Sequence, residues 1–390
     1  MLRLPPSARA ALPYALAYAG LFGAIGLYLP YFPVFLKGRG FSAEEIALVV
    51  ALPAWLRLAT TPALAGLADS SGRPRRVMVI LALGALACFL GLSLVHSLLL
   101  VALLQGLGAL LHQPQMPINE SLTIQASKRP AGEGGFDYGR ARLWGSVAFV
   151  LANLGGGWLL TGRPAELVLW AFIAVLAATA LVLLALPAGP GPAARPARRW
   201  RLPWALLAER RFLLFCATGA LLQGTHGFYY AFGSLNWLSA GLSESWVGWL
   251  WATGVIAEVL LFWQGGRLVR RFGAYRMMAL GIAAGLVRWP LMAVVADPWL
   301  LLPVNALHAL TFAASHLGAM RHIAETVAPE RAATSQALYA TITGSLGIGS
   351  VMFASGWLYQ GFGGHGYLAM ALLSAVAALP LALLARSRSA

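Results

Sequence analysis

Long runs of apolar residues, interrupted by Gly, Pro or charged residues, cover most of the 390-residue chain. Each run is long enough for a helix that crosses a bilayer, which needs about 20 mostly apolar residues. The pattern predicts six spans in the first half of the chain and six in the second: 12–36, 44–66, 77–96, 98–119, 140–161 and 165–187, followed by 211–237, 244–265, 275–296, 299–320, 333–360 and 366–385.

Between the two sets of spans lies a stretch rich in Pro, Gly, Ala and Arg, which is a composition typical of linkers. We therefore expect an all-α polytopic membrane protein with twelve transmembrane helices. Its predicted parts are an N-terminal six-helix bundle over 1–187, a cytoplasmic linker over 188–210 and a C-terminal six-helix bundle over 211–390.

The composition agrees with a membrane protein and excludes other classes. Of all residues 59% are hydrophobic and 11% charged, and the mean hydropathy is +0.73. Soluble domains have about 25% charged residues, so a water-soluble enzyme does not fit. Cys88 and Cys216 both lie inside apolar runs, so we expect free thiols rather than a disulfide.

The net charge of +15 would suggest nucleic-acid binding, but its distribution indicates a membrane topology instead. If the first span runs from inside to outside, the opposite side receives only Lys37, Arg39 and Arg163, and the spans keep Arg57 and Arg288. Nearly all of the 28 Lys and Arg residues then lie in cytoplasmic segments, as the positive-inside rule requires. The pattern places both termini in the cytoplasm, with an uncleaved first span and no nucleic-acid partner.

The two halves of the chain resemble each other. Gly40 and Gly241 each precede a span, and Gly72 and Gly273 are separated by the same number of residues. Near the fifth and eleventh spans, the sequence from Gly156 to Leu159 is echoed from Ser355 to Leu358. Chance similarity of apolar sequence is the alternative, but glycines and charged loops recur together. Two parallel six-helix repeats are the layout of a transporter with its substrate site between the halves.

The loop from Gly66 to Arg76 resembles the signature of the major facilitator superfamily between its second and third spans. A degenerate second copy runs from Gly266 to Arg276. The two glycines permit a tight turn, and the acid can bind helix-end amides or an arginine. A solvated charged turn is the alternative. The resemblance implies that four residues take part in gating: Gly66, Asp69, Gly72 and Arg73.

Four further segments resemble the bacterial 3-phenylpropionate transporters, a proton-coupled group related to lactose permease. They run from Asp137 to Ser146, Leu222 to Tyr230, Val255 to Val259 and Leu286 to Trp289. The likeness covers most of the chain, but the loop from 127 to 136 is longer and richer in Gly. It implies proton-coupled uptake of a small organic anion such as an aromatic carboxylate, in the bacterial cytoplasmic (inner) membrane, by a monomer without a cofactor.

Three ionisable residues lie inside predicted spans of the second half: Glu258, Arg288 and His308. Such groups cost about 2.5–3.5 kcal/mol each on insertion scales, so each indicates a function. An acid that can be loaded, a permanent cation and an imidazole can form a proton-exchange site. Lactose permease has Glu, Arg and His on the equivalent helices, which implies that these three couple transport to protons. A buried pair of Glu258 and Arg288 that only sets packing is the alternative.

Two arginines are candidates for binding an organic anion. Arg57 stands at the position of the first half that corresponds to Glu258 in the second, and an unpaired basic group there could anchor a carboxylate. Arg142 and Glu120 lie near the cytoplasmic ends of the fifth and fourth spans. The resemblance to lactose permease implies a substrate-holding pair, and a surface or gate salt bridge is the equal alternative.

Polar side chains form stripes on several spans. The fourth span has Gln105, His112, Gln115 and Asn119 at helical spacing, and the seventh has Gln223, His226 and Tyr230. The tenth has Asn305 three residues before His308. In the resembled superfamily these spans line the central cavity, so we expect His112, Gln115, Gln223, His226, Tyr230 and Asn305 to bind substrate. Hydrogen-bonded packing between helices is the alternative.

Other functions fit the sequence less well. His308 and His316 lack a third ligand, so we expect no metal site. No nucleophile–base cluster points to an enzyme, and the short linker and tail offer no sensor domain. A sugar or nucleoside symporter and a drug–proton antiporter stay open as alternatives. The expected partners are a small-molecule substrate, protons and the lipid bilayer.

Overall fold

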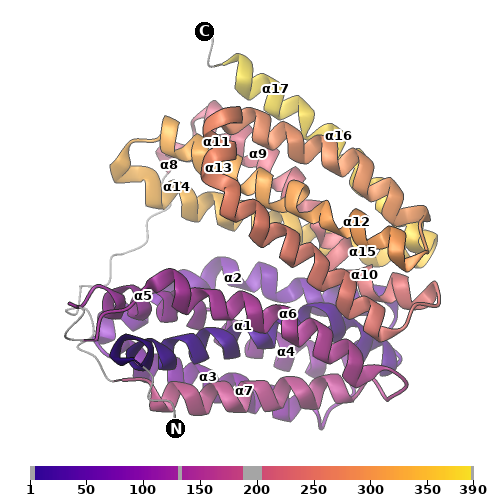
Figure 1. Ribbon diagram of the computed structural model, residues 1–390. Helices are drawn as coiled ribbons and strands as arrows, with labels where there is room; N and C mark the ends of the chain where they lie inside the picture. Colours follow the sequence, from indigo (N-terminus) through magenta and orange to yellow (C-terminus); the bar gives the residue numbers. More distant parts are fainter. Residues whose placement is uncertain (1–4, 131–133, 188–203, 388–390) are drawn as a thin grey trace. The chain divides into compact units, whose positions relative to one another are not determined.

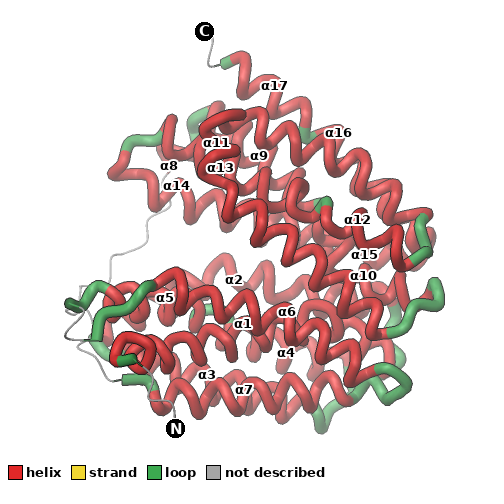
Figure 2. Tube along the Cα trace, in the orientation of Figure 1, coloured by secondary structure: helices red, strands yellow, loops and turns green. Residues whose placement is uncertain are grey.

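The computed structural model describes residues 5–130, 134–187 and 204–387, with the backbone alone at residues 6, 59–70, 204, 205 and 333. Every regular element within these ranges is a helix, and none is a strand (Figure 2). Eight helices or runs of helices are long and apolar enough to cross a membrane, judged by length and composition. Most of the predicted linker lies outside the described residues, and its described part begins with the short helix α8 (Trp204–Leu207).

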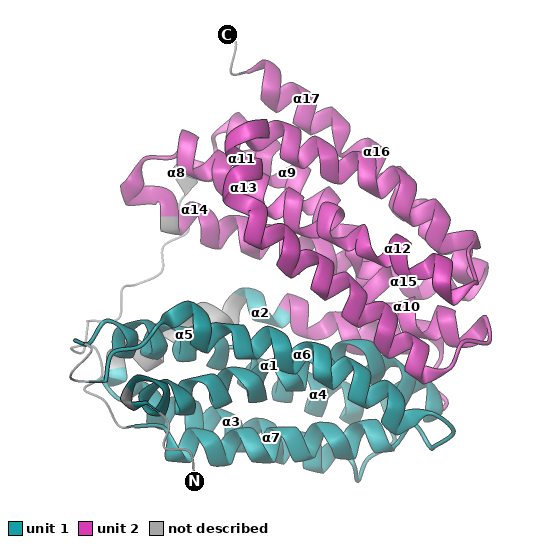
Figure 3. Ribbon diagram, in the orientation of Figure 1, with its two compact units in different colours: residues 1–39, 56–200 teal, residues 40–55, 201–390 magenta. Residues whose placement is uncertain are grey.

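The chain forms two compact units (Figure 3). Unit 1 contains residues 1–39 and 56–200, and unit 2 contains residues 40–55 and 201–390. The chain therefore passes between the units within helix α2 (Ala43–Ser71) as well as along the 188–203 stretch. The first turns of α2 pack inside unit 2, where Gly356 leaves room for the backbone of Glu44.

Unit 1 is built on its first helix. Helix α1 (Pro6–Gly38) packs along α6 (Tyr138–Leu160) and α7 (Leu167–Ala185), and α3 (Pro74–Leu92) packs on α4 (Leu98–His112) and α7 (Figure 1). Helix α5 (Gln115–Ser127) continues the line of α4 after a break. The α1–α6 contact depends on Gly26, because a Cβ there would lie 2.7 Å from the carbonyl oxygen of Phe149.

Unit 2 begins with α9 (Arg210–Gly224) and α10 (His226–Ser239), followed by the long element α11 (Glu244–Val294). Gly273, with a φ of +74°, divides α11 into two helices, as the two predicted spans require. The remaining elements are α12 (Pro298–Ala306), the π-helix η2 (Ala309–Ala314), α13 (Ser315–Thr326), α14 (Pro329–Thr341), the π-helix η3 (Ile342–Ile348), α15 (Gly349–Phe362), η4 (Gly363–Gly366), α16 (Tyr367–Val376) and α17 (Ala378–Arg386).

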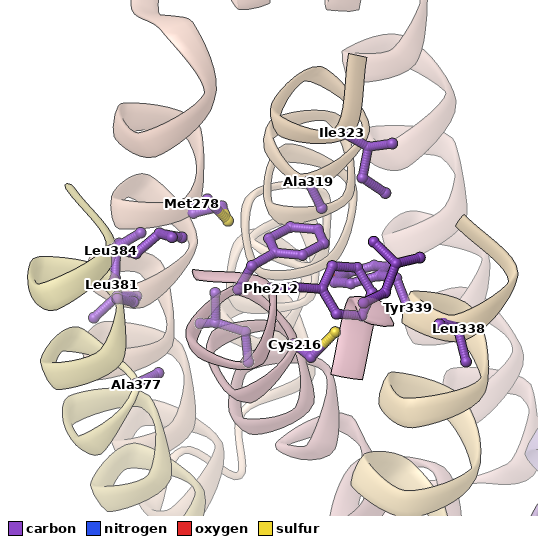
Figure 4. Close-up of a cluster of buried hydrophobic side chains, with 14 residues drawn as sticks. Phe212, Cys216, Met278, Ala319, Ile323, Leu338, Tyr339, Ala377, Leu381 and Leu384 are labelled. Carbon is purple, nitrogen blue, oxygen red and sulfur yellow. The ribbon is translucent and has the colours of Figure 1, made fainter. Parts of the chain in front are cut away.

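One end of unit 2 is held together by a cluster of buried side chains (Figure 4). Phe215 and Cys216 of α9 meet Tyr339 of α14, and the rings of Phe215 and Tyr339 stack at a centroid distance of 4.6 Å. Leu381 of α17 closes the other side of the cluster. Close contact is possible because Gly219 has no Cβ, which would lie 2.4 Å from the Tyr339 ring. Cys216 is thus a buried free thiol that fills the core.

Several spans predicted as single helices are interrupted near their middles, and three of these interruptions lie beside residues of the polar stripes. The fourth breaks between His112 and Gln115, where Pro114 cannot donate a backbone hydrogen bond. The seventh breaks at Thr225, whose hydroxyl donates to the carbonyl of Leu222 at 2.7 Å. The tenth changes from α to π geometry after Leu307. Apolar periodicity does not detect such breaks, because the residues on either side remain hydrophobic.

The backbone carries the internal repeat that the sequence predicts. Gly40 and Gly241 have φ values of +85° and +88°, and Gly72 and Gly273 have +61° and +74°. A third pair, Gly162 and Gly363, has +67° and +53° at the same separation along the chain. Only glycine adopts this left-handed region without strain. The same turns therefore recur in the same places of the two halves, which confirms the repeat.

Arg39 ties three loops together at one end of unit 1. Its side chain, only 6% exposed, forms a salt bridge of 2.6 Å with Glu166. The same guanidinium donates to the carbonyl oxygens of Leu92 and Val95, at 3.0 and 2.7 Å. Leu92 is the last residue of α3, and a positive charge is favourable at the end of a helix. The sequence predicted only that Arg39 lies on the side of the membrane that has few positive charges.

We expect Gly241→Ala to lower the free energy of unfolding by about 1–2 kcal/mol, because alanine is strained in the left-handed region. No heavy atom lies within 4 Å of the added Cβ, so crowding cannot contribute. Thermal unfolding of the purified protein in detergent measures the change. Gly155→Ala is the matched control, since Gly155 is helical with equal space around it, and there alanine should stabilise by about 0.5–1 kcal/mol. Equal effects would contradict the explanation.

Candidate functional site

The structure of unit 2 brings the three predicted ionisable residues into one chain of contacts. Glu258 and Arg288 lie on α11, on opposite sides of the turn at Gly273, and His308 lies one residue before η2. Nη1 of Arg288 is 3.2 Å from Nδ1 of His308. Nε2 of the same imidazole is 3.4 Å from Oε2 of Glu258. His308 therefore connects the cation to the acid.

The hydrogen-bonding rules assign the tautomer of His308. A guanidinium can only donate, so Nδ1 of His308 accepts from Arg288 and carries no proton. The ring proton then lies on Nε2 and points to the carboxylate of Glu258. The arrangement is a permanent positive charge, a neutral imidazole and an acid in series. Only the acid, with a side chain 22% exposed, reaches the surface of its unit, since Arg288 is fully buried.

A second branch leads from Arg288 to another imidazole. Nη1 of Arg288 donates to the hydroxyl of Thr311 at 2.9 Å, and this hydroxyl is 3.1 Å from Nε2 of His226. Nδ1 of His226 faces the carbonyl of Gln223 at 3.2 Å, so Nδ1 carries the proton and Nε2 accepts from Thr311. The rings of His226 and His308 lie 5.2 Å apart. Thr311 thus holds the position of the guanidinium between the two imidazoles.

Aromatic rings surround the buried guanidinium. Its central carbon lies 4.8 Å from the ring centre of Tyr229 and 4.5 Å from that of Trp289, both within cation–π range. Nε and Nη2 of Arg288 find no hydrogen-bond partner among the described residues. A buried charge without full pairing is costly, so the rings and the two bonds of Nη1 supply what stabilisation the site offers.

The other unit 2 candidates border this network. Asn305 accepts a hydrogen bond from the hydroxyl of Tyr229 at 3.3 Å and donates to the carbonyl of Leu301. Gln223 donates to the carbonyl of Phe312 at 3.5 Å. The ring of Tyr230 lies 5.8 Å from that of His226. The structure therefore gathers Gln223, His226, Tyr230 and Asn305 around the three ionisable residues.

Sequence reasoning missed Thr311, Tyr229 and Trp289. Thr311 follows His308 by three residues and so continues the polar stripe of the tenth span, which was an available signal. Tyr229 and Trp289 lie in segments that resemble related transporters, but their residue types gave no signal of their own, because aromatic residues are common in apolar spans and most serve packing or the membrane interface.

In unit 1 a cavity of about 400 Å³ contains two of the predicted residues, Arg57 and His112. Tyr28 and Phe172 supply aromatic walls, and Gln113 adds an amide. Nδ1 of His112 and Oε1 of Gln113 have no hydrogen-bond partner within the described part of the chain. The cavity thus combines an apolar lining, one cation and free polar atoms, which is the usual make-up of a small-molecule site.

Gln115 lies just beyond the break between α4 and α5. It is buried, donates to the carbonyl of Leu111 at 3.1 Å, and leaves Oε1 unpaired among the described residues. Asn119, one turn further, has no described partner for either amide atom. The polar stripe of this span is therefore buried in unit 1 with unused hydrogen-bonding capacity.

Arg142 and Glu120 have different partners. The guanidinium of Arg142 lies 4.2 Å from the ring centre of Phe22, in a cation–π contact. Glu120 accepts a hydrogen bond of 2.6 Å from the hydroxyl of Tyr138. No salt bridge between described side chains joins Arg142 to Glu120. Aromatic residues explain why the two charged groups do not pair. Phe22 of α1 contacts Arg142, and the hydroxyl of Tyr138 of α6 binds Glu120.

The loop with the expected gating residues is described in part. Gly66 lies within α2, and the side chain of Asp69 is outside the described residues. Gly72 makes the turn with a φ of +61°, and α3 begins two residues later. The side chain of Arg73 is exposed, and its backbone N–H donates to the hydroxyl of Ser71 at 3.1 Å.

Comparison with known proteins identifies the fold and the class. A family model described as the MFS_1 like family, of the major facilitator superfamily, matches residues 12–369. The chain belongs to this family. A probable 3-phenylpropionic acid transporter of Escherichia coli (strain K12) is 35% identical over 370 residues, which cover 92% of this chain and 94% of that protein. The maltose permease of Geobacillus stearothermophilus is 30% identical over 387 residues, covering 96% and 94%.

Solved structures agree with the major facilitator fold. The nucleoside transporter NupG superposes with a TM-score of 0.84 at 17% identity, covering 97% of this chain and 98% of that one. A bacterial homologue of the human lysosomal transporter Spinster, inward-facing and unoccupied, gives 0.77 at 14% identity, covering 98% of each chain. The protein is thus an all-α, multi-pass membrane transporter of this superfamily, and not an enzyme.

We expect Thr311→Val to lower the free energy of unfolding by about 1–3 kcal/mol, because it leaves one donor of buried Arg288 without its acceptor. Thr218→Val is the matched control. Thr218 is equally buried in unit 2, but its hydroxyl donates only to the carbonyl of Leu214 in its own helix. Thermal unfolding of both purified variants in detergent gives the comparison, and a loss no larger than that of the control would show that Thr311 does not hold Arg288.

Proposed function

We propose that this transporter couples the uptake of a small organic anion, such as an aromatic carboxylate, to protons by alternating access. It acts as a monomer in the bacterial cytoplasmic membrane with both termini in the cytoplasm. The observation that carries this proposal is the series Glu258, His308 and Arg288, in which an acid faces a cation through a neutral imidazole. Proton coupling needs such a group, whose charge can change while a fixed charge beside it cannot.

The series supports a simple exchange of charge. When Glu258 is ionised, its carboxylate accepts a hydrogen bond from Nε2–H of His308 and is attracted by the positive charge of Arg288. A proton from outside converts Glu258 to a neutral acid, which ends the attraction and leaves Arg288 with an unbalanced positive charge. Binding of one anion together with this proton then leaves the net charge of the protein unchanged. After the halves rock, the proton leaves to the cytoplasm, where Glu258 again becomes the counter-ion of Arg288.

The cavity of unit 1 supports the anionic substrate. The Arg57 guanidinium can bind a carboxylate in two parallel hydrogen bonds, and the rings of Tyr28 and Phe172 suit an aromatic body. The volume of about 400 Å³ lies within the range for small-molecule sites. Arg57 is thus the preferred anchor over Arg142, which is engaged by Phe22. His112 adds a polar contact in this cavity. The other residues that we expect to bind substrate are Gln115 in unit 1 and Gln223, His226, Tyr230 and Asn305 in unit 2, each considered within its own unit. Gly66, Asp69, Gly72 and Arg73 are expected to take part in gating.

The name of the Escherichia coli relative supports an aromatic acid. A second candidate, a sugar symporter, is favoured by the relative from Geobacillus stearothermophilus, which is named a maltose permease. The cavity favours the acid, because most of its lining is apolar and a sugar needs many polar partners.

We expect Glu258→Gln to bind and exchange substrate but to lose uphill accumulation, because the amide cannot release a proton. The measurement is uptake of radiolabelled 3-phenylpropionate into proteoliposomes with an imposed pH gradient, followed by exchange without a gradient. Glu325→Gln is the control, since Glu325 pairs with Arg321 at 2.6 Å away from the network. Undiminished gradient-driven accumulation by Glu258→Gln would remove this acid from the coupling mechanism.

We expect Arg57→Gln to abolish the preference for a carboxylate over its neutral amide. The wild-type protein should bind 3-phenylpropionate at least tenfold more tightly than 3-phenylpropionamide, a difference of about 1.4 kcal/mol. The variant should bind both with similar affinity in equilibrium titrations of detergent-solubilised protein. Arg163→Gln, in an exposed loop of the same unit, should keep the preference. Tight binding of maltose with no binding of the acid would favour the sugar symporter.

A further inference from the structure

A hollow of about 610 Å³ lies at one end of unit 1, outside the proposed transport site. Arg73, Arg75 and Arg76 form its polar end, at the start of α3. Ile80, Leu122 and Leu184, from α3, α5 and near the end of α7, form its apolar side. The hollow therefore joins a concentration of positive charge to a hydrocarbon surface.

The three arginines differ in what they already bind. Arg75 donates to the carbonyl oxygens of Leu183, at 3.4 Å, and of Leu184, so it is engaged with the end of α7. Arg73 and Arg76 are exposed, and neither takes part in a salt bridge with a described side chain. Planar guanidinium groups match the oxygens of a phosphate, and the start of a helix adds a favourable field for an anion.

The apolar side of the hollow is open as well. The side chain of Ile80 is 68% exposed and that of Leu184 is 48% exposed. Both lie on helices that are long and apolar enough to span the membrane. Ile80 follows the arginines on α3, and Leu184 lines the same hollow from α7. A free phosphate would satisfy the arginines and leave this surface uncovered. A ligand that satisfies both parts carries a phosphate and hydrocarbon chains in one molecule.

We propose that this hollow, defined by Arg73, Arg76, Ile80 and Leu184, is a binding site for one anionic phospholipid. The phosphate binds Arg73 and Arg76, and the first part of an acyl chain covers Ile80 and Leu184. Basic residues near a membrane attract anionic lipid even without a defined site. The hollow makes this attraction specific to one location, because it holds the lipid headgroup and the acyl chain at fixed places on unit 1. The proposal is independent of proton coupling and of the substrate.

The second repeat provides a matched control. Arg270 and Arg271 are exposed at the corresponding position of unit 2, in α11 just before the turn at Gly273, and do not line the hollow of unit 1. R270Q/R271Q removes the same charge from the protein as R73Q/R76Q does. A difference between the two double variants therefore reports the site and not the net charge.

The experiment is native mass spectrometry of the delipidated full-length protein with equimolar phosphatidylglycerol and phosphatidylcholine. We expect the wild type and R270Q/R271Q to retain one phosphatidylglycerol with at least tenfold preference, R73Q/R76Q to lose that preference, and R73K/R76K to keep most of it. I80W, which fills the apolar side and keeps the charges, should weaken phosphatidylglycerol binding at least tenfold.

Three results would overturn the proposal. Equal loss in both glutamine double variants would show attraction by net charge alone. Retention of phosphatidylglycerol by R73Q/R76Q would place the lipid elsewhere. Displacement of phosphatidylglycerol by millimolar inorganic phosphate, with I80W unaffected, would identify a phosphate site without an acyl-chain contact. Thermal unfolding of each variant confirms that it is folded. Should the glutamine variant fail to fold, I80W still tests the site, because unchanged phosphatidylglycerol binding by I80W would contradict the acyl-chain contact.

Discussion

A positive charge that cannot be removed, buried inside a membrane-spanning helix, governs the arrangement of unit 2. Arg288 keeps its charge at any relevant pH, so its neighbours must compensate for the loss of water. Thr311 and His308 accept hydrogen bonds from one nitrogen of the guanidinium group. Two aromatic rings lie against the guanidinium group. Glu258 is linked to Arg288 through His308. The proposed proton exchange is a direct result of this constraint, since the protonation of Glu258 changes how well the charge of Arg288 is balanced.

Interruptions of the helices serve the same constraint. A regular α-helix satisfies its own backbone and leaves few ways to change the direction of a side chain. In the tenth span the π-helix begins one residue after His308 and contains Thr311, so the two partners of Arg288 flank the change of geometry. In the seventh span the break at Thr225 comes directly before His226. Short π segments are frequent at functional sites because an extra residue in a turn shifts the side chains that follow.

Much of the fold could be predicted because hydrophobic length and charge placement are local properties. Glu258, Arg288 and His308 stood out since ionisable residues are rare in apolar spans, and the repeat related Gly72 to Gly273 by simple spacing. The partners of these residues could not be predicted in the same way. Thr311 and Tyr229 are ordinary residues of apolar helices, and only the three-dimensional packing shows that they meet Arg288. The partners of Arg142 and Glu120 could not be predicted for the converse reason, because nearby rings and hydroxyls compete for charges that look complementary in sequence.

The left-handed glycines at constant separation imply that the chain arose by duplication of one six-helix ancestor. In such an ancestor a single side chain occupied the position that is now Arg57 in one copy and Glu258 in the other. The two copies now carry opposite charges at this position. A symmetric dimer of identical subunits would carry the same residue in both copies. Fusion into one polypeptide thus freed each copy to specialise.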